Sequence, residues 1–163
     1  MSWIRKWKTR KSNYSWKQID KICRTIAQPY AGKFSCVIGL SRGGLIPATI
    51  IANHLNIRNV YSIGIASYET TSTGEVYIHK HNVYQQIPHD CSCMKRGDHV
   101  LIVDDISDKG ATFNHVTHTY MSKLACEYTT LSLFIKPETA HIPDIYHESI
   151  SQDRWVVFPW EKK

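Results

Sequence analysis

Four consecutive apolar residues at positions 100–103 are typical of a strand that is buried on both faces of a sheet. They run directly into two adjacent carboxylates, Asp104 and Asp105, and then into a short loop that is rich in small residues. A helix is expected next, from about Phe113 to Ala125. Because α/β proteins bind ligands at the carboxyl ends of parallel strands, this pattern predicts a binding site around the two carboxylates.

The rest of the chain alternates between strand and helix patterns. A first helix is expected from Ser15 to Gln28, since Ser15 and Gln18 form a capping box. Its apolar stripe consists of Trp16, Ile19, Ile22, Cys23 and Ile26. Further elements are strands at 35–40, 60–68 and 128–135 and a helix at 45–55. This alternation predicts an α/β fold, with a largely parallel sheet flanked by helices.

Residues 68–97 form no clear core element and read as a mobile polar loop next to the site. This loop contains three histidines and two cysteines, at positions His79, His81, His89, Cys91 and Cys93. They lack the paired spacing of structural zinc sites, so a mobile loop is the preferred interpretation and metal binding the alternative.

The net charge of +6 is concentrated at the N-terminus, where residues 1–11 hold five of the 20 basic side chains and none of the 14 acidic ones. We therefore divide the chain into a basic tail, residues 1–12, and a single, nearly neutral domain, residues 13–163. Trp3 and Trp7 share a helical face in this tail. Packing on the domain or on a neighbouring subunit is the preferred interpretation, and weak binding to a membrane surface or nucleic acid is the alternative.

The location follows from what the sequence lacks. No apolar segment of the signal-peptide type follows the basic residues, and no apolar run approaches the roughly 20 residues that a membrane span needs. The five cysteines are odd in number and scattered, which favours reduced thiols. We expect a cytoplasmic protein, with association at the inner face of the membrane left open.

Two loops have the chemistry of anion sites. In the first, Ser107, Gly110 and Ala111 are small enough for backbone N–H groups to approach a phosphate, and a helix N-terminus follows. The neighbouring carboxylates would repel a phosphate, and they suit sugar hydroxyls or a divalent cation instead. In the second, residues 41–44 place Arg42 and two glycines between a strand and a helix. Although such a turn can be merely structural, the two together predict a phosphorylated ribose with phosphates at both ends.

The first loop resembles the motif with which phosphoribosyltransferases bind 5-phosphoribosyl 1-pyrophosphate (PRPP). That motif has an apolar strand, two acidic residues, variable positions, Asp-Thr-Gly and a closing Thr, and residues 104–105 and 108–112 match it. Lys109 is the departure, because it stands where the family has Thr. The segment 41–47 is similar to the pyrophosphate loop of the xanthine-guanine branch. The resemblance covers most of the chain and implies the type I phosphoribosyltransferase fold, with a flexible hood at about 68–97.

The resemblance also implies roles for individual residues. The implied PRPP-binding residues are Ser41, Arg42, Gly43, Gly44, Asp104, Asp105, Asp108, Lys109, Gly110, Ala111 and Thr112. Asp105, with Asp104 beside it, would hold Mg²⁺ and the ribose hydroxyls, and Asp108 would accept the N7 proton as the catalytic base. In the purine site, Lys136 would donate to the 6-oxo group, Trp155 would stack on the base, and the backbone carbonyl of Val156 would meet the 2-substituent.

These roles predict a purine-salvage enzyme that transfers the phosphoribosyl group from PRPP to guanine or xanthine, with hypoxanthine as a further candidate. A homodimer or homotetramer is the expected assembly, and nucleic acid is not an expected partner. Two alternatives stay open at this point. One is a non-catalytic regulator of the same fold that senses nucleotides, and the other is a phosphoribosyltransferase for a different base.

Overall fold

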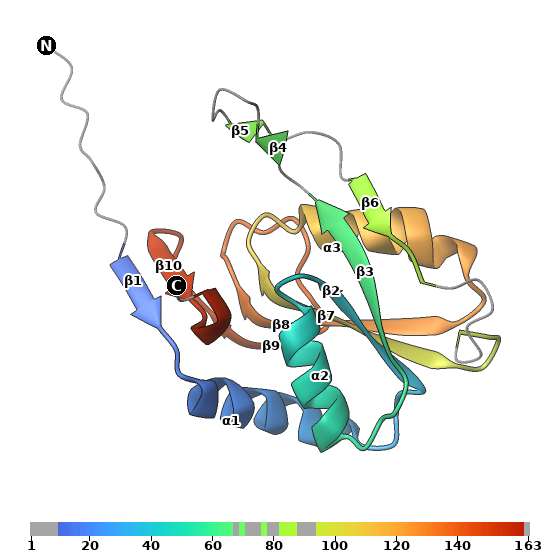
Figure 1. The fold of residues 1–163 in the computed structure, drawn as a ribbon. Coiled ribbons are helices and arrows are strands. Elements are labelled where there is room, and N and C mark those ends of the chain that lie inside the picture. Colours follow the sequence, from blue (N-terminus) through green and yellow to red (C-terminus); the bar gives the residue numbers. More distant parts are fainter. Residues whose placement is uncertain (1–9, 67–68, 71–75, 78–81, 88–93, 162–163) are drawn as a thin grey trace, which may run out of the picture.

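A six-stranded sheet lies at the centre of the protein (Figure 1). The structure is a computed structural model that describes residues 10–66, 69–70, 76–77, 82–87 and 94–161. In order across the sheet, the strands are β6 (Asn82–Gln85), β3 (Val60–Ala66), β2 (Cys36–Ser41), β7 (His99–Ser107), β8 (Glu127–Ile135) and β9 (Ile145–Ser149). All neighbours are parallel except β6, which is antiparallel to β3. The predicted α/β fold is confirmed.

Helices α1 (Trp16–Ala27) and α2 (Leu45–His54) cover one face of the sheet. The predicted capping box is present at the start of α1, because the Ser15 N–H donates to Gln18 Oε1 at 2.9 Å and the Gln18 N–H donates to Ser15 Oγ at 3.3 Å. The helix ends at Ala27, and a short 3-10 turn, η1 (Gln28–Tyr30), which contains Pro29, follows it. Trp16, the first residue of the predicted apolar stripe, remains 54% exposed. It packs at a tilt on Trp160, with ring centroids 5.8 Å apart.

The opposite face is covered by a helical segment of three parts, which are α3 (Ala111–His115), the π-helical turn η2 (Val116–Tyr120) and the 3-10 turn η3 (Met121–Lys123). The prediction of one helix from Phe113 to Ala125 is therefore wrong in its bounds and in its regularity. Thr117 Oγ1 donates to the carbonyl of Phe113 at 2.9 Å within this segment, a side-chain bond of the kind that competes with the regular helical pattern.

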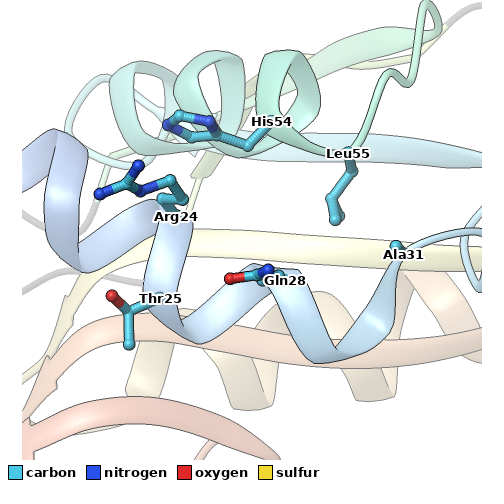
Figure 2. Close-up of a pocket in the computed structure, with 6 residues that line it drawn as sticks. All are labelled: Arg24, Thr25, Gln28, Ala31, His54 and Leu55. Atoms are coloured by element: carbon cyan, nitrogen blue, oxygen red, sulfur yellow. The ribbon is translucent and has the colours of Figure 1, made fainter.

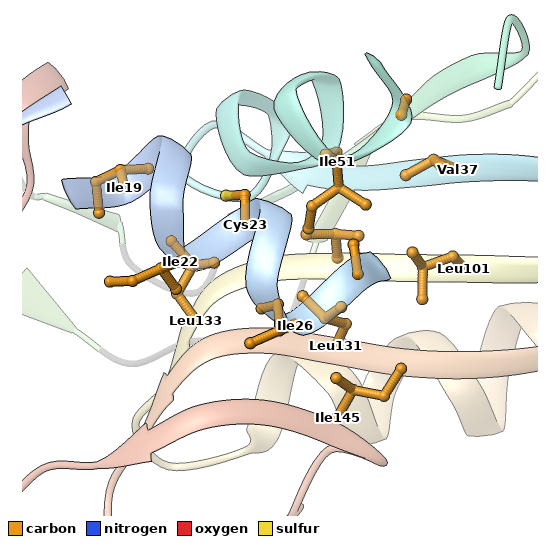
Figure 3. Packing of buried hydrophobic residues seen from close by; sticks show 14 of the residues in the cluster. Ile19, Ile22, Cys23, Ile26, Val37, Ile51, Leu101, Leu131, Leu133 and Ile145 are labelled. Carbon is orange, nitrogen blue, oxygen red and sulfur yellow. The ribbon is translucent and has the colours of Figure 1, made fainter. Parts of the chain in front are cut away.

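Apolar side chains fill both spaces between the sheet and its helices. On the α1 and α2 side, Ile22 and Ile51 pack with Leu101 and Leu131 from the central strands, as Figure 3 shows. On the other side, Ile102 of β7 belongs to a second cluster of buried residues under α3. Leu101 and Ile102 thus face opposite layers, as successive residues of a strand must. The fully apolar run at 100–103 therefore reflects a strand that is covered on both faces.

The two ends of the described chain meet in a separate pair of parallel strands. Strand β1 (Arg10–Asn13) pairs with β10 (Arg154–Val157), and a short turn, η4 (Pro159–Glu161), follows (Figure 1). Residues 10–12 of the predicted tail are thus part of a strand. The remainder of the tail, residues 1–9, lies outside the described residues.

Much of the predicted hood also lies outside the described residues, including all five of its histidines and cysteines. The described pieces include a two-stranded ribbon, β4 (Glu69–Thr70) with β5 (Val76–Tyr77), and strand β6 at the edge of the main sheet. No helix within the described ranges is long and apolar enough to cross a membrane.

Candidate functional site

The loop between β2 and α2, residues 41–44, lies against the two carboxylates of β7. A methyl group added at Gly43 would overlap the Asp105 carboxylate, and one at Gly44 would come within 2.7 Å of the Asp104 Cα. Glycine is therefore the residue that allows this close approach. The Ser41–Arg42 peptide bond is cis, and the Arg42 side chain is exposed. The structure thus brings together two segments that are about 60 residues apart in sequence.

Asp104 and Asp105 lie within strand β7 rather than after it, which corrects the sequence interpretation. The strand continues because β8 pairs with it as far as Ser107 and Ile135. The Asp105 N–H donates to Asp104 Oδ1 at 3.0 Å. Burial raises the pKa of Asp104 well above its ordinary value, and the charge of Asp105 raises it further. Burial also raises the pKa of Asp105 to about 6, with a smaller contribution from Glu161.

This carboxylate pair has the chemistry of a site for a hard cation. Its oxygen atoms are the ligands that Mg²⁺ prefers, and Mg²⁺ in proteins is commonly held by one or two carboxylates together with phosphates of the substrate. Within the described residues, no group of three or more His, Cys, Asp or Glu side chains forms a metal cage. The two carboxylates thus supply the oxygen ligands that a cation of this kind takes from a protein.

The segment after β7, which we call the motif loop (residues 107–112), turns the chain into α3. Gly110 has a φ of 73°, a left-handed conformation that favours glycine, and it directly precedes the helix. Among the described residues, no side chain caps this helix end. Lys109, the departure from the family motif, is exposed, whereas Asp108 is partly buried. The motif loop therefore presents a helix N-terminus with a cation beside it, an arrangement that favours anions.

A cavity of about 180 Å³ brings Asp108 together with the three residues predicted to contact a purine. Its lining consists of Asp105, Ile106, Asp108, Lys136, Arg154, Trp155, Val156, Phe158 and Glu161. Trp155 is 56% exposed, so one side of its ring is accessible to a ligand. Val156 is buried. The structure thus places residues from β7 and β10 around one small cavity, together with Lys136, which directly follows β8.

Lys136 is 6% exposed, and its ammonium group already has two partners. Nζ donates to the carbonyl of Ser151 at 3.0 Å and also to the carbonyl of Arg154. These bonds tie the end of β8 to the turn before β10, the strand that carries Trp155. Because an ammonium has three protons, one remains for an acceptor in the cavity.

A second cavity, of about 490 Å³, adjoins the first at Asp105 and Glu161. It is also lined by Arg42, Gly43, Ile46 and Trp160. The combined space is in the range of small-molecule sites, roughly 300–1,000 Å³. One carboxylate, Asp105, therefore lies between a cationic loop on one side and the cavity with Lys136 and Trp155 on the other.

Sequence reasoning missed Glu161 and Trp160. Both lie in η4 and line the second cavity together with Asp105 of β7. Trp160 stacks on Phe158, with ring centroids 4.6 Å apart, and its Nε1 is buried without a partner among the described residues. The aromatic composition of residues 155–160 was the available signal, but it does not distinguish a core residue from one that lines a cavity.

A third cavity, of about 350 Å³, lies between α1 and α2 and is shown in Figure 2. Arg24 and His54 line it, and His54 Nε2 lies 2.8 Å from Asp20 Oδ1. The cavity is at the C-terminal ends of both helices, where the unpaired carbonyl groups produce partial negative charge. This environment opposes a phosphate, so we place the candidate site at the carboxyl ends of the strands.

The chain matches the family model of the phosphoribosyl transferase domain over residues 12–162. It is 32% identical over 153 residues to a xanthine-guanine phosphoribosyltransferase of Cereibacter sphaeroides, and 28% identical over 149 residues to one of Idiomarina loihiensis. Each alignment covers 90% of this chain and 84% of the relative.

Solved structures agree with this match. A purine phosphoribosyltransferase of Pyrococcus horikoshii is 29% identical and superposes with a TM-score of 0.71, over 94% of this chain and 95% of that one. A xanthine-guanine-hypoxanthine phosphoribosyltransferase of Helicobacter pylori, 24% identical, shares the fold with a TM-score of 0.71 over 93% of this chain and 94% of that one. Because the family match spans the central sheet, the motif loop and the C-terminal wall of the cavity, the chain belongs to the phosphoribosyltransferase family.

Proposed function

We propose that this phosphoribosyltransferase acts in purine salvage and joins a 6-oxopurine to PRPP, releasing pyrophosphate. Guanine and xanthine are the first candidates, and hypoxanthine is the third. The observation that carries this proposal is the pair of adjoining cavities that meet at Asp105. One has a cationic glycine loop, and the other has a buried ammonium beside an accessible indole. The curated relatives described above support the choice of base.

The PRPP end of the proposed site consists of the two loops and the carboxylates between them. The motif loop, with Lys109, Gly110, Ala111 and Thr112, would hold the 5′-phosphate through backbone N–H groups and the positive end of α3. Residues 41–44 would hold the pyrophosphate, with the Arg42 guanidinium as a fork for its oxygen atoms. Asp104 and Asp105 would accept hydrogen bonds from the ribose hydroxyls.

The same carboxylates support the assignment of Mg²⁺, which phosphoribosyltransferases typically use together with PRPP. We assign Asp105 as the principal metal ligand, with Asp104 beside it. When bound, the cation neutralises charge on the departing pyrophosphate. Two carboxylates with raised pKa values are costly to ionise without such a partner, which is the physical support for this assignment.

The base end of the site would select a purine with a 6-oxo group. Trp155 would stack on the ring, a contact worth about 1–3 kcal/mol for nucleobases on aromatic side chains. The third proton of Lys136 would donate to the 6-oxo oxygen, and the carbonyl of Val156 would meet the 2-substituent. Adenine carries an amino group at position 6, which cannot accept this proton. A buried donor left unpaired costs about 1–3 kcal/mol, enough for a tenfold to hundredfold preference.

In the reaction, a ring nitrogen of the base forms a bond to ribose C1 while the bond from C1 to the pyrophosphate oxygen breaks. The electron pair of that bond leaves with pyrophosphate. Asp108 would accept the proton that the imidazole ring of the base loses, because it lines the same cavity as Lys136 and Trp155. The Arg42 side chain and the backbone of residues 41–44 would stabilise the charge that develops on the leaving group.

The test is pyrophosphate release with PRPP and Mg²⁺ against guanine, xanthine, hypoxanthine, adenine and uracil, each alone. We expect turnover with the oxopurines and at least tenfold lower kcat/KM with adenine. The Lys136→Met variant should lose this preference, whereas Lys123→Met, on the distant turn η3, should keep it. If no base reacts while PRPP still raises the Tm, the proposed activity is wrong and the nucleotide-sensing regulator takes its place. Turnover confined to adenine or uracil would refute the choice of substrate.

We also propose an assembly of two or four copies and a cytoplasmic location. Light scattering coupled to size-exclusion chromatography tests the first of these, and a mass of one chain at micromolar concentration would contradict it. Cell fractionation tests the second. Recovery in the membrane fraction that is lost on deletion of residues 1–9 would instead favour binding of the basic tail to the membrane surface.

A further inference from the structure

A segment outside the recognised motif packs against the motif loop and is hydrogen-bonded to it. We call it the support loop (residues 139–144). The Ser107 hydroxyl donates to the carbonyl of His141 at 2.8 Å, and it lies 2.9 Å from Thr139 Oγ1. The Ala140 N–H donates to the carbonyl of Lys109 at 3.1 Å. The motif loop is thus bonded to the support loop at both its first residue and its third.

The approach of the two loops is close at Gly110. A methyl group there would come within 2.7 Å of Thr139 Oγ1 and would overlap the backbone N of His141. The left-handed turn that begins α3 is therefore packed directly on the support loop. Any displacement of the support loop would move the backbone N–H groups at the start of α3.

The His141 side chain extends the same contact into α3. Its ring stacks on Phe113, with centroids 5.0 Å apart and an interplanar angle of 16°. Its Nδ1 lies 3.0 Å from Asn114 Oδ1. Phe113 and Asn114 belong to the first turn of α3, immediately after the motif loop. The imidazole thus holds the helix end at which a phosphate would be received.

The support loop is itself anchored to the sheet. Thr130 of β8, which is 2% exposed, donates from its backbone N and its Oγ1 to Asp144 Oδ2, at 2.7 and 2.8 Å. The Asp144 N–H donates to Thr130 Oγ1 at 3.1 Å. The other ring nitrogen of His141 lies 3.4 Å from the same Thr130 hydroxyl. His141 therefore lies between a fixed strand on one side and the start of α3 on the other.

We propose that His141 is a positioning residue, which holds the motif loop and the first turn of α3 in the shape that binds the 5′-phosphate of PRPP. This inference rests on the proposed function, because it takes the motif loop as the phosphate site. Burial lowers the pKa of His141, against an opposing effect of Asp144 and with a smaller effect of His118, so the neutral ring is the form that acts near pH 7.5. A neutral ring adds no charge to the site, and its contribution is orientation.

The test separates the phosphate end of the site from the base end. His141→Phe keeps an aromatic ring for the stack on Phe113 but removes both ring nitrogens, and His141→Ala removes the stack as well. We expect KM for PRPP to rise about 10- to 100-fold, since displacement of a binding group by about 1 Å has effects of this size. KM for guanine should change less than threefold. His147→Ala, on the exposed strand β9, is the matched control and should leave both values unchanged.

A second pair of variants keeps the test informative if the His141 variants do not fold. Thr139→Val removes the hydroxyl that faces Ser107 with little change in volume, and Thr139→Ser retains it. Valine should raise KM for PRPP severalfold, and serine should restore the wild-type value. In the valine variant, an equal rise in KM for PRPP and in KM for guanine, or no rise in KM for PRPP, would overturn the inference.

Titration with PRPP and Mg²⁺, followed by calorimetry, distinguishes this inference from the proposed function. Wild-type protein that binds PRPP, together with His141→Phe protein that binds it equally well, contradicts only the positioning role. Wild-type protein that binds no PRPP contradicts both. Wild-type protein that binds PRPP without turning over any base, with weaker binding by the variant, supports the positioning role and refutes the proposed activity.

Discussion

The half-buried carboxylates of β7, with their raised pKa values, predict that ionisation of Asp105 destabilises the ligand-free protein. Asp105 has an ordinary pKa of 3.8 that burial raises to about 6. A shift of this size corresponds to about 3 kcal/mol of stability that the folded protein lacks when the group is ionised. Replacement of Asp105 by Asn removes the charge with nearly the same volume. We therefore expect Asp105→Asn to be more stable than the wild type at neutral pH.

The pH dependence follows from the direction of the shift. The folded pKa is above the unfolded one, so the cost is present in full above about pH 7, shrinks as the pH falls through 6, and is gone below 3.8. A gain of about 2–3 kcal/mol corresponds to a rise in Tm of about 4–12 °C in a domain of this size. Asp105→Asn should show this rise in full at pH 8.0 and about a third of it at pH 4.5, where Asp105 is largely ionised in the unfolded chain and protonated in the folded one. Loss of the Asp105 charge also removes one of the causes that raise the pKa of Asp104, which stabilises the variant further.

The assay is thermal unfolding, followed by circular dichroism without Mg²⁺, of the wild type, Asp105→Asn and the exposed control Glu148→Gln. The control removes the same charge from the outer strand β9 and should leave Tm within about 1 °C at both pH values. Addition of PRPP and Mg²⁺ should raise the Tm of the wild type and not that of Asp105→Asn. A Tm of Asp105→Asn that is no higher than wild type at pH 8.0, or a gap of equal size at both pH values, would refute the reasoning.

Three further substitutions test the other parts of the site. Lys136→Gln should lower the free energy of unfolding by about 1–3 kcal/mol, because it leaves the Ser151 carbonyl without its charged donor. The same variant should raise KM for guanine about tenfold or more, and an unchanged KM would show that Lys136 is not part of the base site. Trp155→Ala should raise KM for guanine about tenfold with little change in Tm, whereas Trp16→Ala, a tryptophan of equal exposure on α1, should leave that KM unaltered. Lys109→Thr should change KM for PRPP less than tenfold, and loss of all turnover would contradict a simple replacement of Thr by Lys at this position.

The elements that the sequence predicted well are those in which local pattern and burial agree. The apolar run at 100–103 predicted a strand covered on both faces, and β7 lies between two clusters of buried residues. Ser15 and Gln18 predicted the start of α1, because a capping box is completed within four residues of the chain. The two glycine-containing turns, which follow β2 and β7, were also predicted, because each is encoded by a few consecutive residues.

The sequence failed where a distant segment decides the local outcome. Strand β7 continues through both carboxylates because β8 pairs with it as far as Ser107, and no pattern within residues 104–107 indicates that partner. The sequence predicted one regular α-helix from about Phe113 to Ala125. In the structure the α-helix starts at Ala111, and a π-helical turn replaces it from Val116. The apolar stripe of α1 correctly predicted which face of the helix is buried. It did not show how far the neighbouring elements cover that face, and Trp16 is 54% exposed.

By itself, the sequence determined the order of the four central strands, β2, β3, β7 and β8, with helices α1 and α2, the two loops suited to phosphates and the likeness to phosphoribosyltransferases. These depend on residues that are close together in the chain. Only the tertiary structure decided which groups share the cavity at Asp105, that two of the three protons of Lys136 are already used, and that His141 lies behind the motif loop. The physical reason is that burial and hydrogen bonding between side chains depend on segments that are brought together by folding, and their separation along the chain leaves no local pattern.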